Sequence, residues 1–98
     1  MIIAKHTNHD GQTIIAVIDD ELLGKNYETE ELQLDFSQKF YSGTKAEPAT
    51  IIEEIKKSYM AVCAGNETVG LLVEQGFIGR DDVNIIAGIP YVYITLPE

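Results

Sequence analysis

The chain has 98 residues, of which 45% are hydrophobic and 23% charged, a composition typical of a globular protein. This length predicts a single domain over residues 1–98 with a modest core. With 16 acidic and 7 basic side chains the net charge is −9, which opposes contact with a phosphate backbone and argues against DNA as a partner.

Targeting signals are absent from the pattern of apolar residues. No apolar run approaches the ~18 residues that a membrane span needs, and Lys5 and His6 interrupt the first run before it could serve as a secretory signal. Cys63 is the only cysteine, which excludes an internal disulfide and fits a reducing compartment. We therefore expect a cytoplasmic protein without membrane contact.

The first two predicted elements form a β-hairpin over residues 2–18. The run Ile2–Thr7 predicts a strand, with residues 2, 4 and 6 on one face and residues 3, 5 and 7 on the other. Residues 8–11 end in Asp-Gly, a dipeptide that tolerates the positive φ of tight hairpin turns. Thr13–Ile18 is apolar on both faces, so we expect it at the centre of a sheet.

The segment after this hairpin is the most acidic of the chain. Asp19 or Asp20 is placed to cap a short helical turn by accepting hydrogen bonds from its free backbone amides. Leu22 and Leu23 would then face the core, and Gly24 would end the turn in the left-handed conformation.

The middle of the chain predicts one further strand between irregular segments. Residues 26–31 are polar and acidic, and we expect a loop there. Leu32–Phe36 alternates apolar and polar residues, which predicts a half-buried strand. Phe40–Gly43 ends this part of the chain in a glycine turn, and residues 44–47 are interpreted as a linker.

An amphipathic helix follows. Ile51, Ile55 and Tyr59 recur every four residues, which predicts a helix over Pro48–Ser58 whose proline is favoured in the first turn. The short apolar run Met60–Ala64 is closed by a glycine and predicts a buried strand.

A second helix begins after this strand. Asn66 is its expected cap, Val69, Leu72 and Val73 supply its apolar face, and Gly76 ends it.

The last part of the chain predicts two strands. Residues 79–82 form a turn, Val83–Ala87 a strand, Gly88–Pro90 a bend, and Tyr91–Leu96 the last strand.

These elements predict an α+β fold, with a mixed, mostly antiparallel sheet of five or six strands and two main helices packed on it. The helices around Ile55 and Leu72 are essential to this arrangement. The expected core comprises Ile14, Val17, Leu22, Leu34, Ile51, Ile55, Val62, Leu72, Val73, Ile85 and Val92.

Three histidine and acidic side chains near the first hairpin suggest a metal site. His6, His9 and Asp10 are suitable ligand types for zinc or nickel. The strand and the turn need not direct the two rings to one point, and Cys63 lies in an apolar run, so surface histidines beside a hairpin are the simpler interpretation.

The acidic segment has two interpretations. Asp19, Asp20 and Glu21 could act in acid–base chemistry or bind magnesium. Capping of a turn explains the aspartates without a ligand, and Glu21 is spaced to pair with Lys25.

Two further features have competing explanations. Cys63 would need an exposed site and a neighbouring base to act as a nucleophile, and its apolar neighbours indicate burial instead. Gly65 and Asn66 precede a helix and could present amides to an anion, although such a turn is more often only a cap.

The expected binding surface consists of Lys25, Tyr41 and Gly43 with the bend at residues 88–91, and the tyrosines offer a further candidate. Tyr91 and Tyr93 share one face of the last strand, and with Tyr41 they could stack on bases or pack against a partner. Aromatic residues on strands more often cover a sheet. Nucleic-acid binding would require a local cluster of basic residues drawn from Lys5, Lys25, Lys39, Lys45 and Arg80.

Several short motifs occur in order along the chain. They are Asp-Glu-Leu-Leu-Gly-Lys at residues 20–25, Phe-Tyr-Ser-Gly at residues 40–43, Gly65 with Val69, and Gly-Ile-Pro at residues 88–90. With these motifs the chain resembles, over nearly its whole length, a small archaeal family catalogued as domain of unknown function 424.

The resemblance implies an archaeal, cytoplasmic protein with a link to translation or RNA, and it implies no substrate or cofactor. The family pattern has an asparagine three residues before the glycine that Gly65 matches, and here that residue is Val62. It has a histidine after the proline that Pro90 matches, and here that residue is Tyr91. Both departures remove polar groups from the expected site.

We therefore predict a non-enzymatic interaction module that binds RNA or a translation-associated protein, as a monomer or a weak homodimer formed through an exposed edge strand. We expect no cofactor. The alternative is a small enzyme or metal-binding protein that uses Asp19–Glu21 and the histidines. We assign no catalytic residue and no metal ligand. The candidate binding residues are Asp20, Glu21, Lys25, Tyr41, Gly43, Gly65, Gly88, Pro90 and Tyr91.

Overall fold

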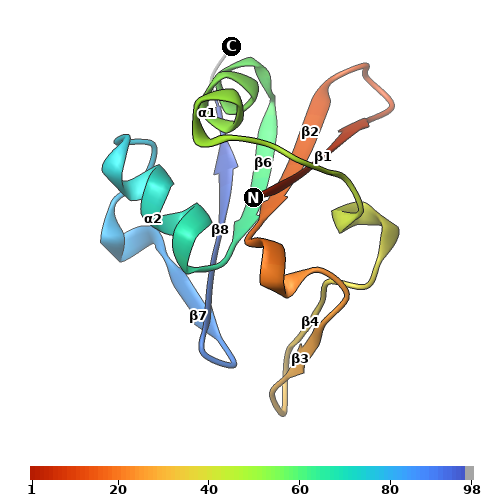
Figure 1. The fold of residues 1–98 in the computed structure, drawn as a ribbon, viewed down its shortest axis with the longest axis vertical. Helices are drawn as coiled ribbons and strands as arrows, with labels where there is room; N and C mark the ends of the chain where they lie inside the picture. The colour runs from red at the N-terminus through yellow and green to blue at the C-terminus, as the bar shows by residue number, and fades with distance from the viewer. Residues whose placement is uncertain (97–98) are drawn as a thin grey trace.

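The computed structural model describes residues 1–96. Its main feature is a six-stranded sheet in the order β5-β1-β2-β6-β8-β7, with both helices on one face (Figure 1). The main strands are β1 (Ile2–Thr7), β2 (Thr13–Ile18), β5 (Thr44–Lys45), β6 (Met60–Ala64), β7 (Asn84–Ile86) and β8 (Ile89–Thr95). The remaining elements are β3 (Asn26–Glu28), β4 (Gln33–Asp35), α1 (Pro48–Lys57), α2 (Asn66–Glu74) and the 3-10 turns Asp20–Leu22, Lys39–Tyr41 and Arg80–Asp82.

The predicted fold class is confirmed. Among the strands of residues 1–96 in the main sheet, only β2 and β6 pair in parallel, whereas β1–β2, β1–β5, β6–β8 and β7–β8 are antiparallel. The parallel pair needs a long connection, which the β3–β4 hairpin and α1 provide. The hairpin over residues 2–18, both helices and the central position of β2 agree with the sequence.

Two apolar clusters lie on opposite faces of the sheet. The larger packs α1 and α2 on the sheet through residues such as Ile15, Ile51 and Leu72, all fully buried. The smaller lies on the face without α1 and α2, where Phe36 and Leu34 of the β3–β4 region cover one end of the sheet. The strands therefore bury both faces at that end, which explains their nearly continuous apolar sequences.

Asp19 joins the ends of two strands. Because Ile18 and Ala64 are paired in the parallel ladder, Asp19 leaves β2 beside the point where the chain enters α2. Its buried carboxylate accepts the Glu67 amide at 3.0 Å, and the Thr68 amide and hydroxyl, each at 2.7 Å.

The predicted caps are therefore corrected. Asp19 makes no side-chain cap to the turn Asp20–Leu22 that follows it. It instead caps α2, since Glu67 and Thr68 are the second and third helical residues, whose amides an N-cap side chain normally accepts. Asn66 is the first helical residue and Gly65 occupies the cap position.

Gly65 is required by this contact. Its φ is +108°, a conformation that other residues rarely adopt, and a Cβ atom at this position would overlap the Asp19 carboxylate. Because Gly65 has no side chain, the Asp19 carboxylate can reach the amides of α2.

Several predicted boundaries are wrong for local reasons. The expected loop at residues 26–31 contains β3, because this strand pairs with β4 in a small separate hairpin. The expected linker at residues 44–47 contains β5, which extends the sheet beside β1. The bend expected at residues 88–90 is confined to Ala87 and Gly88, whose φ angles of 52° and 80° suit a tight hairpin turn.

Some residues expected to be buried are not. Ile85 was placed in the core but is 64% exposed, because it lies on edge strand β7 while α2 packs over β6 and β8. Ile14 and Val73 are only partly buried. Leu23 and Tyr59 are exposed, since the chain leaves its helical turn before each of them.

No helix of residues 1–96 is long and apolar enough to cross a membrane.

We predict that Asp19→Ala lowers the free energy of unfolding by about 2–3 kcal/mol, because two helix amides and a hydroxyl lose a buried acceptor. Urea denaturation followed by circular dichroism measures this change. Asp20→Ala is the matched control, since Asp20 is exposed and contacts no amide of α2. Equal stabilities for the two variants would contradict the capping role.

Candidate functional site

The face of the sheet without α1 and α2 is only partly covered. The β3–β4 hairpin covers the end of this face that is lowest in Figure 1, and the turn Lys39–Tyr41 packs against β1 and β2. The rest of this face varies from exposed at Tyr93 to buried at Val62, and we name this surface the open face. It comprises His6, Ile14, Phe40, Tyr41, Met60, Val62, Tyr91, Tyr93 and Thr95.

Aromatic rings dominate the open face. Tyr91 and Tyr93 of β8 meet edge to face, with ring centroids 5.6 Å apart. Tyr41 meets Phe36 at 5.0 Å and Phe40 at 5.2 Å, also edge to face. Tyr93 is 58% exposed, whereas Tyr41 and Tyr91 are partly buried against the smaller apolar cluster. Tyr93 is therefore the most accessible ring of the group.

Tyr41 lies near Tyr93 of the Tyr91–Tyr93 pair. Burial raises the pKa of the Tyr41 phenol, and the neighbouring Tyr93 and the Asp35 carboxylate raise it further. The structure thus brings together the three tyrosines that the sequence singled out, from the turn Lys39–Tyr41 and from β8.

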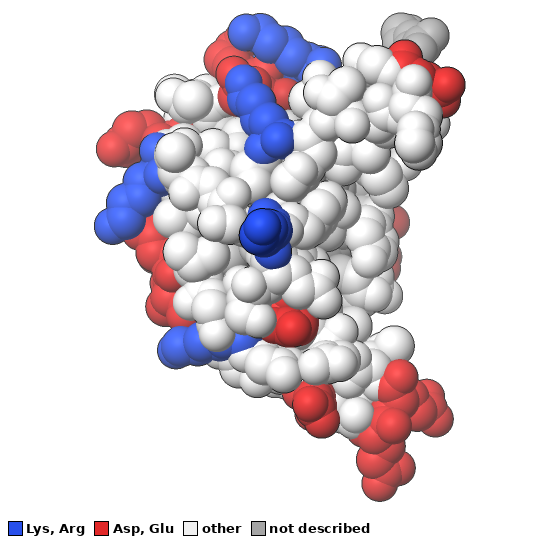
Figure 2. Space-filling model, turned by 90° about the vertical axis from the view of Figure 1, so that its right-hand side faces the viewer, with Lys and Arg blue, Asp and Glu red and all other residues white. Residues whose placement is uncertain are grey.

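None of the described residues that define the open face is charged, although the Asp35 carboxylate lies near Tyr41 and Lys39 belongs to the turn Lys39–Tyr41. Figure 2 views the molecule from the side of β1, where much of the surface is uncharged but a basic side chain lies near the middle. Acidic side chains gather at the lower tip, where Glu28, Glu30 and Glu31 surround the turn of the β3–β4 hairpin. The charge of −9 is therefore unevenly distributed.

His6 contacts Phe40 of the turn Lys39–Tyr41, which borders the open face. Its ring stacks on Phe40 with centroids 4.7 Å apart and planes inclined by 8°. Its Nε2 lies 2.8 Å from the Phe40 carbonyl oxygen, which can only accept, so Nε2 donates this hydrogen bond. His9 is exposed in the adjacent turn.

Asp20 lies away from the tyrosines. It pairs with the Met1 amino group at 2.8 Å and with Lys45 at 3.5 Å. The hydrogen bond from that amino group, with the nearby charges, lowers the pKa of the Asp20 carboxyl. Glu21 and Lys25 are exposed and form no ion pair with each other in the described chain.

Three of the predicted glycines are explained by backbone geometry. Gly43 lies so close to the Ile3 carbonyl that a Cβ atom would overlap it. Gly65 accommodates Asp19, and Gly88 forms the β7–β8 turn. Of the nine candidate residues, the open face retains Tyr41 and Tyr91.

The acidic segment does not assemble a metal site or a carboxylate pair. Asp19 is buried at the start of α2 and Asp20 faces Met1 and Lys45, so the two carboxylates serve different contacts. Within residues 1–96, no group of three His, Cys, Asp or Glu side chains is arranged to hold a metal ion.

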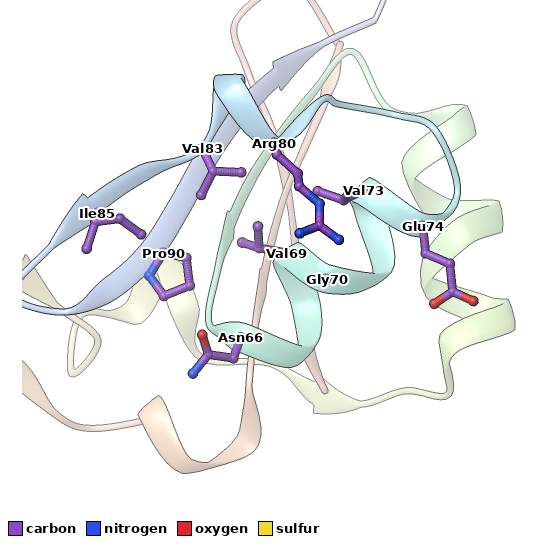
Figure 3. A pocket seen from close by; sticks show the side chains of 9 residues that line it. All are labelled: Asn66, Val69, Gly70, Val73, Glu74, Arg80, Val83, Ile85 and Pro90. Atoms are coloured by element: carbon purple, nitrogen blue, oxygen red, sulfur yellow. The ribbon is translucent and has the colours of Figure 1, made fainter.

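A separate groove lies between α2 and the β7–β8 hairpin. It has a volume of about 690 Å³, with Val69 and Pro90 at its base and Ile85 at one side (Figure 3). Arg80 extends over it towards Gly70, and Glu74 lies at the opposite rim. Of the predicted binding residues only Pro90 lines this groove. Its lining holds one basic and one acidic side chain, which together favour neither an anionic nor a cationic ligand.

The comparisons with known proteins agree with the architecture. A family model described as Protein of unknown function (DUF424) matches residues 6–96. The chain belongs to this family. A crystal structure of an uncharacterized conserved protein from Methanopyrus kandleri is similar to it, with a TM-score of 0.78 and 25% sequence identity. The alignment covers 99% of this chain and 93% of that chain. No curated protein matches the chain.

Val62 and Tyr91, the two positions where the resemblance implies a departure from the family pattern, lie on the same surface. Val62 pairs with Tyr93, and Tyr91 pairs with Ala64, so both positions belong to the open face on neighbouring strands. The alternation in β8 could be seen in the sequence, but the high exposure of Tyr93 could not. That exposure depends on where the β3–β4 hairpin covers the sheet, which the sequence does not reveal.

Cys63 is buried in the larger cluster, and burial raises the pKa of its thiol to about 12. We predict that a thiol reagent at pH 8 modifies the folded protein at least about a hundredfold more slowly than the urea-unfolded chain, because little thiolate forms and access is blocked. Absorbance of the released thiol reports both rates. Comparable rates with circular dichroism unchanged would contradict this.

Gly70 lies in the interior of α2, and a Cβ atom there would meet open space. We predict that Gly70→Ala raises the free energy of unfolding by about 0.5–1 kcal/mol, since alanine restricts the unfolded chain more and creates no clash. Urea denaturation tests this against Gly65→Ala, which should destabilise the fold. A loss of stability in Gly70→Ala would show that the groove tolerates no added methyl group.

Proposed function

We propose that this DUF424 protein is a non-enzymatic interaction module that binds a partner protein through the open face. The observation that supports this most is Tyr93, an exposed ring on an uncharged, aromatic sheet surface. Tyrosine and methionine are enriched in protein interfaces, whose centres are depleted of charge. Tyr41, which lies near Tyr93, and Met60, which pairs with Thr95 of the same face, fit this composition.

The surroundings of the open face favour a protein over a nucleic acid. An exposed ring anchored by neighbouring rings loses little conformational freedom on binding, which suits an interface anchor. Phosphate recognition requires several local cations. The turn Lys39–Tyr41, which borders the open face, supplies one, Lys39, and this favours a protein partner. A cytoplasmic partner from the translation machinery, as the family resemblance implies, belongs to this proposal.

Single-stranded RNA is the second candidate. Tyr91 and Tyr93 present rings on a sheet surface, and base stacking on such rings requires no sequence motif. Binding of this kind would weaken steeply as salt concentration rises.

We predict that Tyr93→Ala reduces partner recovery from archaeal lysate by about tenfold, because the exposed anchor of the interface is lost. The matched control is Tyr59→Ala, which removes an exposed tyrosine outside the open face. Quantitative mass spectrometry of pull-downs with the parent and both variants measures the change. Equal recovery of every protein by all three would contradict the proposal.

A parallel fluorescence titration separates the two candidates. Short single-stranded RNAs at low salt should bind the parent and Tyr93→Ala equally weakly if the partner is a protein. Salt-sensitive binding that Tyr93→Ala abolishes would replace the protein proposal with RNA.

A further inference from the structure

The outer edge of β8 is only partly occupied. β8 runs from Ile89 to Thr95, but β7 pairs only with its first part, from Ile89 to Tyr91. Among the described residues no other strand adjoins β8 on this side, and no loop backbone hydrogen bond reaches Tyr93 or Thr95. Half of the strand therefore has a neighbour on one side only.

The orientation of the backbone follows from its observed contacts. The Pro90 carbonyl accepts the Gly65 amide at 2.9 Å, and the Leu96 amide donates to the Tyr59 carbonyl at 3.0 Å. Both contacts are with the chain at the two ends of β6, so even-numbered residues of β8 direct their polar groups towards β6. Because this direction alternates along a strand, the amides and carbonyls of Tyr93 and Thr95 point outwards.

A cavity adjoins this edge. It has a volume of about 380 Å³, is bordered by Val92–Thr95, and has Phe77 and Ile78 as apolar walls. Asp82 and Asn84 line its remaining side, and no basic side chain does. The site thus combines a row of backbone donors and acceptors with space for an apolar side chain and one acidic side chain, Asp82, at its border.

We propose that the outer edge of β8 at Tyr93 and Thr95 accepts an extended, cationic segment of a partner protein, which adds as a strand and places an apolar side chain against Phe77 and Ile78. An extended backbone is the ligand that matches alternating amides and carbonyls. The Asp82 border and the net charge of −9 favour a cationic segment over a second copy of this chain. The inference rests on the proposed function in that the partner is a protein.

The test uses a synthetic probe, acetyl-Lys-Val-Thr-Val-Thr-Lys-amide, titrated into isotope-labelled protein. We expect saturable shifts and slowed hydrogen exchange of the Tyr93 and Thr95 amides. The same peptide with glutamate in place of lysine should bind more weakly, and the difference should shrink as salt rises.

Thr95→Pro removes an outward-pointing donor and costs no bond to β6, so the fold should persist while probe affinity falls by about tenfold or more. Thr95→Val is the matched control, since it keeps the amide, and it should bind like the parent. Equal binding by the proline and valine variants, or no exchange protection of Tyr93 and Thr95 in the parent, would overturn the proposal.

Two outcomes separate this proposal from the proposed function. Suppose that Tyr93→Ala loses the partner captured from lysate while Thr95→Pro still binds both this partner and the probe. The open face then binds the partner without the outer edge of β8, and the proposal for that edge fails. If the probe binds the edge but Tyr93→Ala keeps every partner, the open-face proposal fails instead. A dimer in sedimentation that Thr95→Pro dissolves would identify a second copy as the occupant and refute the cationic segment.

Discussion

The hydrogen bonds of the Asp19 carboxylate to the first turn of α2 determine how the two halves of the molecule meet. They connect the end of β2 with the start of α2, across 48 and 49 positions of sequence. The parallel pairing of β2 with β6 places these two points side by side. A buried carboxylate at a helix start is stabilised by the free amides and the helix dipole, and it would be costly without them.

The contact between Asp19 and α2 places α2 on the sheet. It leaves the surfaces around Ile85 and Tyr93 uncovered. With α2 over β6 and β8, edge strand β7 remains uncovered and Ile85 is exposed. On the opposite face the β3–β4 hairpin covers only one end of the sheet, and Tyr93 lies beyond its reach. The open face and the free edge of β8 meet at this residue, whose ring belongs to one and whose backbone belongs to the other.

The local features of the fold could be predicted from the sequence, whereas contacts between distant segments could not. The alternation in residues 2–18 and the four-residue spacing around Ile55 specify a hairpin and a helix without knowledge of the rest. The role of Asp19 could not be found this way, because the nearest amides in sequence offered an equally good cap. Ile85 was misplaced for a similar reason: its strand pattern is correct, but burial depends on where α2 packs.

The candidate site shows the same limit. Gly43 and Gly65 belong to distinctive motifs, yet each allows a close backbone or side-chain approach that only the tertiary structure displays. Tyr91 and Tyr93 share a face because side chains alternate along β8, whereas only the tertiary structure brings Tyr41 of the turn Lys39–Tyr41 to the same surface. The most direct test of the central claim is hydrogen–deuterium exchange of the protein with a captured partner. We expect new protection at residues 39–41 and 91–96. Protection confined to the groove between α2 and β7 would contradict the assignment of the open face.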